Sequence, residues 1–556
     1  MKENTASTEH VVSAKNLDHL GLIASIFRRL KLIERIDQLL PHKDPRRRLS
    51  AGEAVLALVL NGLGFTARRL YLAPQFFKNK PLSTLFGRDI DADDINDHVL
   101  GRVLDEIYDY GVTQWFMNLS VPLGIEEQLI SKSLHLDSTS IAVEGAYEKV
   151  AATEDDFRPI ALVHGFSKDK RPDLKQFIIN MVVSGAAGYP IACDPQDGNA
   201  SDKKTFLQTQ QNLSKILQQL TSIEDFVWIM DAAFYSKENL QLMQDTLWVS
   251  RMPESIKEAK ELISLQELTW EESYEGYSWA TFPSTYGDVK QRLLLIRSEA
   301  AFHREKEAFY TNLNRLEAKH LKEIVALSKK EFDCQADAKK ACESFMPSKC
   351  FQVIWEIVPV SRYNQVGRPA KNTTPEKTAY QITGTLNRKE AVIKKEEDSL
   401  GRFILATNQC DESAMPASQV LKSYKQQQAV EGGFRFIKDS SFLVDSVFLK
   451  SNKRIEALSA IMCLCLLIYS VGQHWIRKTL KDTNTTISDQ KKKPTQKPTL
   501  RWIFMCFDGA IQLQESFNAE STSQYKTKRM VLNVNLFHKK IATIIGHIAL
   551  EIYGFA

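Results

Sequence analysis

The chain has 556 residues, of which 43% are hydrophobic and 25% are charged, as expected for a globular protein of about three or four domains. Its 72 basic and 68 acidic residues give a net charge of only +4, so nucleic-acid binding cannot be inferred from net charge and would need local basic clusters. The eight cysteines form no C-x-x-C pair, which indicates reduced thiols and excludes a disulfide framework. The N-terminus lacks an apolar signal core, and a cytoplasmic protein is therefore predicted.

Residues 1–130 are predicted to form a helical N-terminal domain. Apolar residues recur at helical spacing over Leu20–Leu40, and Ser50 with Glu53 forms a capping box before the next helix. Arginines flank these helices. Two interpretations remain open, a dimerisation scaffold and a domain that binds DNA ends, and both can hold together.

Residues 131–252 change character and alternate strand-like with helical runs. The order is three strands, a helix, then strand, helix and strand, which is the order of a ribonuclease-H-like α/β core. The predicted strands are 133–143, 159–166, 176–184, 226–230 and 247–251, and the predicted helices are 202–220 and 236–246.

The rest of the chain completes the predicted fold class, an α/β ribonuclease-H-like core with a β-containing insertion between helical terminal regions. Residues 253–400 read as the insertion with a long helix, and 401–480 as the second part of the core. The apolar run from Ala457 to Val471 is shorter than the ~20 residues of a membrane span, so a buried helix and no membrane are predicted. A linker is expected at 481–498 and a basic helical region at 499–556.

Three acidic residues stand at informative places. Asp137 lies in a strand-like run, and Asp231 follows the apolar run Phe226–Met230, where a buried strand ends. Ligands bind at that edge of open α/β sheets. Taken alone, an aspartate there is more often a turn-former or a helix cap. Glu431 lies in a helical stretch, and together the three carboxylates would suit two hard divalent cations.

The Glu431 stretch carries a polar stripe at helical spacing. Tyr424, Gln427 or Gln428, Glu431, Arg435 and Lys438 fall on one side of a helix with 3.6 residues per turn. Such a stripe is usually a solvated face. Here an apolar strand and a nearly all-apolar helix flank it, which favours a stripe that faces a cleft.

The sequence at this point resembles a known family. The pattern Y-x2-R-x3-E-x6-K marks a subgroup of the DDE transposases of bacterial insertion sequences, and Tyr424, Glu431 and Lys438 match it. Asp137 and Asp231 resemble the first two acids of the DDE triad, and the 200-residue gap from Asp231 to Glu431 resembles the family's β-rich insertion. The stretch from His164 to Gln176 is also similar to one found in such enzymes. Gln427 departs from the pattern, because it stands where the family has arginine, which points to a rearranged phosphate contact or a degenerate copy.

The resemblance implies an enzyme that cuts and rejoins phosphodiester bonds. Asp137, Asp231 and Glu431 would bind two Mg²⁺ or Mn²⁺ ions, and Tyr424 and Lys438 would hold DNA phosphates, with Arg435 replacing the charge that Gln427 lacks. The implied partners are double-stranded DNA at the terminal inverted repeats and at the target, with a homodimer on the DNA. Such a protein would be bacterial and nucleoid-associated when bound.

Weaker signals and two alternative functions remain. Arg368 lies in a Gly-Arg-Pro core like that of minor-groove-binding hooks, although a plain basic loop is the simpler interpretation. Trp270 and Trp279 would either stack on an unpaired base or pack in a hairpin, and packing is the favoured interpretation. The alternatives are a catalytically degenerate DNA-binding derivative and a ribonuclease-H-like nuclease without strand transfer.

Overall fold

The computed structural model describes residues 11–41, 47–65, 72–145, 147, 158–168, 170–185, 187–200, 202–221, 225–363, 375–439, 449–518 and 525–556. The chain forms two compact units, the first from residues 1–249 with 422–556 and the second from residues 250–421. Asp137, Asp231 and Glu431 all belong to the first unit, so one body carries all three acids. Arg368 lies outside the described residues.

A five-stranded arrangement forms the centre of the first unit, in the order β4-β3-β2-β5-β6. β3 is antiparallel to β2 and β4, whereas β5 is parallel to β2. Across the sheet, the neighbouring strands are the third, second, first, fourth and fifth of this core in chain order. This order confirms the predicted ribonuclease-H-like core. Its elements are β2 Ser133–Val143, β3 Lys175–Ser184, β4 Tyr189–Gln196, α8 Asp202–Leu220, β5 Val227–Met230, α9 Lys237–Leu242 and β6 Trp248–Arg251.

One predicted strand of this core is wrong. Residues 159–166 form no strand and contribute a single bridge, between Val163 and Gln176. The missing strand is β4, which the sequence analysis overlooked because it contains Pro190 and Pro195. Proline cannot donate to a ladder and is tolerated on an edge strand, and β4 is the edge strand of this sheet.

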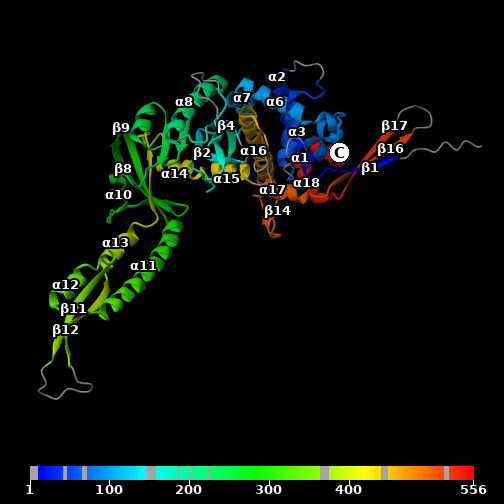
Figure 1. The fold of residues 1–556 in the computed structure, drawn as a ribbon. Helices are drawn as coiled ribbons and strands as arrows, with labels where there is room; N and C mark the ends of the chain where they lie inside the picture. Colours follow the sequence, from blue (N-terminus) through cyan, green and yellow to red (C-terminus); the bar gives the residue numbers. More distant parts are fainter. Residues whose placement is uncertain are drawn as a thin grey trace, which may run out of the picture. The chain divides into compact units, whose positions relative to one another are not determined.

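The long helix α16 Asn452–Asp482 packs against helices from both the N-terminal and the C-terminal parts of the first unit (Figure 1). This helix is 31 residues long and is apolar enough to span a membrane by composition, but 89% of its most apolar window is buried in the protein. The prediction of a buried helix is confirmed. Further helices here are α1 Leu20–Arg29, α2 Leu32–Leu39, α3 Ala51–Leu63, α4 Ala73–Lys78, α5 Leu82–Phe86, the 3₁₀ turn η2 Ala92–Asp94, α6 Asp97–Tyr110, α7 Val112–Glu126, α17 Leu500–Cys506, α18 Leu536–Ile545 and α19 His547–Ile552.

Specific bonds join the two ends of the chain within this unit. The Arg29 guanidinium donates to the Ile545 carbonyl at 2.6 Å, and the Tyr553 hydroxyl donates to the Asp18 carbonyl at 2.6 Å. The predicted capping box at the start of α3 is present, with Ser50 and Glu53 bonded to each other's backbone. The N-terminal helices therefore share a core with the C-terminal ones.

The C-terminal region contains strands that the sequence analysis did not expect. β16 Ile511–Asn518 lies between β1 Val11–Asn16 and β17 Tyr525–Leu532 in an antiparallel sheet. The overlooked signal is the alternation of apolar and polar residues that begins at Ile511. The expected linker at 481–498 also holds a short hairpin, β14 Ile487–Ser488 with β15 Pro494–Thr495.

The second unit contains the predicted long helix and further strands. One antiparallel set runs in the order β13-β9-β8-β7, and another runs β10-β12-β11 with α11 packed on β12. Trp279 is buried and its indole donates to Glu271 at 2.8 Å, which favours its packing role. The elements are α10 Lys257–Ile263, β7 Glu271–Tyr274, β8 Tyr277–Tyr286, β9 Val289–Ser298, α11 Glu299–Ser328, β10 Glu331–Phe332, α12 Gln335–Glu343, β11 Phe351–Arg362, β12 Lys377–Arg388, α13 Glu390–Asp398 and β13 Arg402–Thr407.

Candidate active site

Asp137 and Asp231 stand just beyond the last residue pair of two neighbouring strands. The parallel pairing of β2 with β5 ends at Leu136 opposite Met230, Asp137 is the next residue of β2, and Asp231 is the first residue after β5. Neighbouring strands lie about 4.8 Å apart, and residues at one register position point to the same face. Both side chains are half-buried. We therefore expect the two carboxylates to lie near each other at the carboxyl end of β5, which remains a prediction.

Local hydrogen bonds fix the direction of each carboxylate. The Ser138 N–H donates to Asp137 Oδ1 at 2.7 Å, and the Ala233 N–H donates to Asp231 Oδ1 at 2.9 Å. The second bond belongs to the turn that follows β5, so Asp231 is also the turn-former considered in the sequence analysis. An ionised carboxylate can accept about four hydrogen bonds or ligand contacts over its two oxygens.

The segment that leads to Glu431 runs along β2. The Ser133 hydroxyl donates to the Ser423 hydroxyl at 3.1 Å. His135 lies two residues further along β2, on the same face as Ser133. Burial lowers the pKa of His135 to about 4, and a hydrogen bond with the Gln426 side chain offsets this shift only in part. Asp137 is the third residue on this face, because alternate residues of a strand share a face. The helical segment thus follows β2 towards Asp137.

Close packing brings α15 Gln428–Ile437 onto the sheet beside Asp137. A Cβ added to Gly433 would lie 3.1 Å from the Met181 methyl and 3.0 Å from Leu466 on α16. Met181 on β3 is the register partner of Asp137, so both lie at one level of the sheet. Phe434 and Ile437 are buried, whereas Glu431 is exposed.

The single helix predicted over 424–438 is interrupted. Two residues separate α14 Ala417–Lys425 from α15, and the Gln427 N–H donates to the Tyr424 carbonyl at 3.0 Å in the turn between them. Tyr424 therefore lies on the first helix, and Gln427 immediately precedes the second. Beyond the break the stripe persists: Glu431 and Arg435 are exposed and Lys438 is half-exposed.

The donor set at this edge fits a divalent cation in part. Asp137 and Asp231 present oxygen ligands that hard cations prefer, and two adjacent carboxylates gain from a cation between them. Among the described residues, however, no three acidic, histidine or cysteine side chains are grouped closely enough to hold a metal ion. The helix of Glu431 thus packs on the sheet at the level of Asp137, but Glu431 is not grouped with the two aspartates in a metal site among the described residues.

A residue to which the sequence analysis gave no role also lies at this edge. Lys168 lies within the stretch from His164 to Gln176, and its ammonium donates to the Ser138 carbonyl at 2.8 Å and to the Ser138 hydroxyl at 2.6 Å. The only sequence signal for it was the family-like stretch, because a lone lysine in a loop is usually a solvated surface residue.

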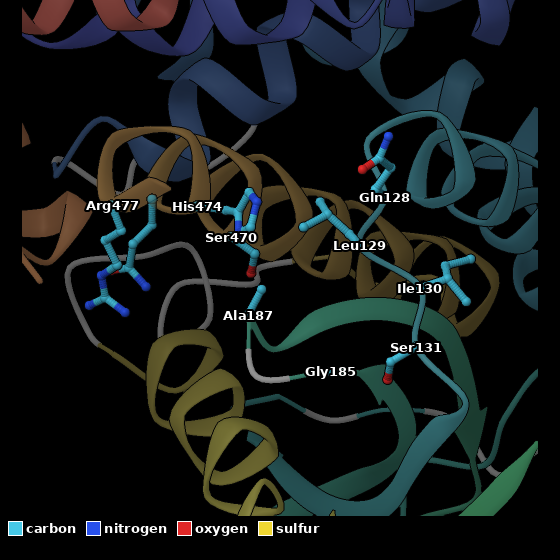
Figure 2. A pocket seen from close by; sticks show the side chains of 10 residues that line it. Gln128, Leu129, Ile130, Ser131, Gly185, Ala187, Ser470, His474 and Arg477 are labelled. Atoms are coloured by element: carbon cyan, nitrogen blue, oxygen red, sulfur yellow. The ribbon is translucent and has the colours of Figure 1, made fainter. Parts of the chain in front are cut away.

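A separate cavity of about 350 Å³ lies at the other end of β2 (Figure 2). Ser131, just before β2, lines it together with Ser470, His474 and Arg477 of α16. Six residues of extended chain between Ser131 and Asp137 span roughly 20 Å. This cavity therefore does not belong to the aspartate pair.

Two family models match the chain. Residues 12–121 match a domain of unknown function, DUF4277. Residues 133–327 match the model described as "Transposase DDE domain". The chain belongs to the DDE superfamily of transposases. The matched range of the transposase domain contains Asp137 and Asp231, whereas Glu431 lies beyond it.

Other comparisons add little to this assignment. A cryo-EM structure of the piggyBac transposase synaptic complex with hairpin DNA is similar at 11% sequence identity, with a TM-score of 0.35 over 89% of this chain and 81% of that chain. A similarity of that size carries no argument about this transposase. No curated protein matches the chain.

Proposed function

We propose that this transposase cuts DNA at the ends of its own mobile element and joins the freed ends to target DNA, using Asp137, Asp231 and Glu431. The observation that supports the proposal is the β2–β5 register, because Asp137 follows the last paired residue of β2 and Asp231 follows the last residue of β5, both within the matched transposase domain. Glu431 is the proposed third acid because its helix packs over the register partner of Asp137.

The chain's own residues have distinct roles in this proposal. Asp137 and Asp231 would hold divalent cations, with Mg²⁺ or Mn²⁺ as the candidates and two ions as the proposed number, and Glu431 would complete the site. Such ions, when bound, activate a water or 3′-hydroxyl nucleophile and stabilise the leaving oxygen. The backbone bonds to Asp137 Oδ1 and Asp231 Oδ1 would help to orient the two carboxylates for this role.

The stripe on α14 and α15 is the proposed phosphate-binding surface. Arg435 is exposed, and Lys438 is half-exposed one turn further along, so both are accessible to a DNA backbone. Tyr424 and Gln427 would contribute neutral hydrogen bonds, since glutamine lacks the charge and five-donor fork of arginine. The proposed partners are the terminal inverted repeats and the target duplex, and the proposed assembly on DNA is a homodimer.

The test uses a duplex carrying the inverted repeat that flanks this gene. With Mg²⁺, the wild-type protein is expected to cut at the repeat boundary and to join the cut end to a second duplex. Asp231→Ala is expected to bind the end and leave it uncut. Undiminished cutting by Asp231→Ala would contradict the assignment.

Two other outcomes correspond to the alternative functions. Binding without cutting by the wild-type protein would identify a degenerate derivative, for which Gln427 at the arginine position is the supporting observation. Cutting without joined products would identify a ribonuclease-H-like nuclease that lacks strand transfer.

A further inference from the structure

The cavity beside α16 has a cationic wall. Ser470, Gln473, His474 and Arg477 line it at helical spacing, so they share one face of α16. Figure 2 shows Ser470, His474 and Arg477 on the opposite side of the cavity from the turn that contains Ala187. Among the described residues that line the cavity, none is an aspartate or a glutamate. The positive charge of this wall therefore has no lining carboxylate to balance it.

Arg477 is half-buried and has no carboxylate partner in the described part of the chain. Its Nε–H donates to the Pro498 carbonyl at 2.8 Å, and this neutral oxygen is its hydrogen-bond partner among the described residues. Burial lowers the pKa of Arg477, and the nearby Tyr469 opposes this shift only in part. Charges removed from water are normally paired, because an unpaired one loses its hydration without compensation. The guanidinium thus presents Nη1 and Nη2 to an anion, which such a planar fork can bind with two hydrogen bonds.

His474 adds an uncharged donor to the same wall. Burial lowers the pKa of His474, as does Lys478, and the carboxylates of Glu127 and Asp482 act in the opposite direction. The ring is therefore neutral at pH 7 and carries one N–H that can donate to a ligand. Glu127 itself accepts the indole N–H of Trp475 at 2.8 Å. A cation and a neutral donor in a cavity of about 350 Å³ suit a phosphate group.

The cavity lies close to the end of α15. The ring centroids of Phe436 and Tyr469 are 4.5 Å apart, and Tyr469 immediately precedes Ser470 of the cavity wall. The backbone N–H of Arg501 donates to the Tyr469 hydroxyl at 3.2 Å. Lys438, the residue after α15, is half-exposed, and Arg501 is exposed. The phosphate-binding surface proposed for α14 and α15 therefore ends beside the part of α16 that leads into the cavity.

We propose that this cavity binds a phosphate group of the DNA backbone, with Arg477 as its charged contact and His474 as its neutral donor. This role rests on the proposed function and adds a second phosphate site to the α14–α15 stripe. The cavity lies roughly 20 Å along β2 from Asp137, which corresponds to roughly six base pairs of duplex at about 3.4 Å per pair. The contact would hold the duplex in register at a distance from the chemistry. In the competing explanation, Arg477 only fastens Pro498 to α16.

Four variants separate a phosphate site from a structural tether. Arg477→Gln removes the charge, and Arg477→Lys keeps it. Ala187→Glu places a carboxylate at the cavity wall and leaves the bond between Arg477 and Pro498 in place. Lys478→Gln is the matched control, because it removes one charge at the next residue of α16, an exposed lysine that does not line the cavity.

Two measurements are made on each variant. Binding to the inverted-repeat duplex is measured over a range of salt concentrations, and thermal unfolding is measured with and without inorganic phosphate. Arg477→Gln and Ala187→Glu should each lower the slope of log binding constant against log salt by about one phosphate contact. Arg477→Lys and Lys478→Gln should keep the wild-type slope. If Arg477→Gln unfolds at a lower temperature than the wild-type protein, Ala187→Glu decides the question.

Three results have a different meaning. A wild-type slope in both Arg477→Gln and Ala187→Glu would overturn the proposal, as would an equal loss of slope in Lys478→Gln. Inorganic phosphate that protects the wild-type protein but not Arg477→Gln, with an unchanged slope for the duplex, would overturn DNA as the source of the phosphate. Duplex binding by the wild-type protein without cutting would contradict the proposed function, while the slopes would still decide for or against the cavity.

Discussion

The two halves of the candidate site are built by different means. Asp137 and Asp231 are placed by strand pairing, since one register of β2 with β5 decides where both side chains emerge. Glu431 is placed by the packing of a ten-residue helix through Gly433, Phe434 and Ile437, and it is exposed. Pairing in a sheet fixes side chains by backbone hydrogen bonds, whereas a packed helix can shift or rotate without breaking its own bonds. We therefore expect the strand half to be formed in the free protein and the helix half to be completed when DNA binds.

The largest effect is expected at the strand half. Asp137→Asn removes a charge from the pair and should slow cutting about a thousandfold, the equivalent of roughly 4 kcal/mol of transition-state stabilisation. Asp225→Asn is the matched control, because Asp225 is exposed near the start of β5 and its φ of 59° suits asparagine. Single-turnover cutting of the inverted-repeat duplex is the measurement. Equal loss in both variants would show a general effect of charge rather than a site.

Acid stability probes the contact between β2 and the turn at Gln426. The folded pKa of His135 is about 4, below its ordinary value of 6.5, so between these values the unfolded state binds a proton that the folded state does not. This group therefore lowers stability as the pH falls from 6.5 to 4, by up to about 3 kcal/mol at about 1.4 kcal/mol per unit. His135→Asn should lose less stability than the wild-type protein over that range.

The pH dependence of His135→Asn must be compared with that of the wild-type protein, because other buried groups also titrate between about pH 4 and pH 7. The pKa of His19 is also lowered by burial to about 4, and burial raises the pKa of Glu456 to about 7, which acts in the opposite direction. Urea unfolding at several pH values would measure the difference. Identical pH profiles of the two proteins would refute the buried, neutral state of His135.

The phosphate contacts of the helix half should change in opposite directions in two variants. Gln427→Arg introduces a charge at the turn before α15, and Arg435→Gln removes one from the exposed stripe. The slope of log binding constant against log salt should rise by about one in the first and fall by about one in the second. If both variants kept the wild-type salt slope, the stripe on α14 and α15 would not contact DNA phosphates.

Two adjacent glycines give the smallest expected effect. A Cβ at Gly432 would meet no atom within 4 Å, so Gly432→Ala should stabilise the protein by up to about 1 kcal/mol through helix propensity. Gly433→Ala would press on Met181 and Leu466 and should unfold at a lower temperature than Gly432→Ala. A reversed order in calorimetry would mean that α15 does not pack on β3 as described.

The sequence predicted the strands that carry Asp137 and Asp231 better than the helix that carries Glu431. The end of an apolar run points to Asp231, and a strand-like run points to Asp137, because both signals are local. The break between α14 and α15 is not local in origin, since it occurs in a glutamine-rich run without glycine or proline. β4 was missed because prolines usually indicate turns, and only the folded sheet shows that this strand lies at an edge, where prolines are tolerated. Lys168 was missed because only the fold brings its loop to Ser138.

The central claim is that Asp137, Asp231 and Glu431 share one metal-binding centre on DNA. The most direct test replaces Mg²⁺ with Fe²⁺ in the DNA-bound protein and maps the backbone cuts made by hydroxyl radicals generated at the metal. The account predicts cuts near residues 137, 231 and 431, all lost in Asp231→Ala. Cuts near the two aspartates with none near residue 431 would contradict the claim.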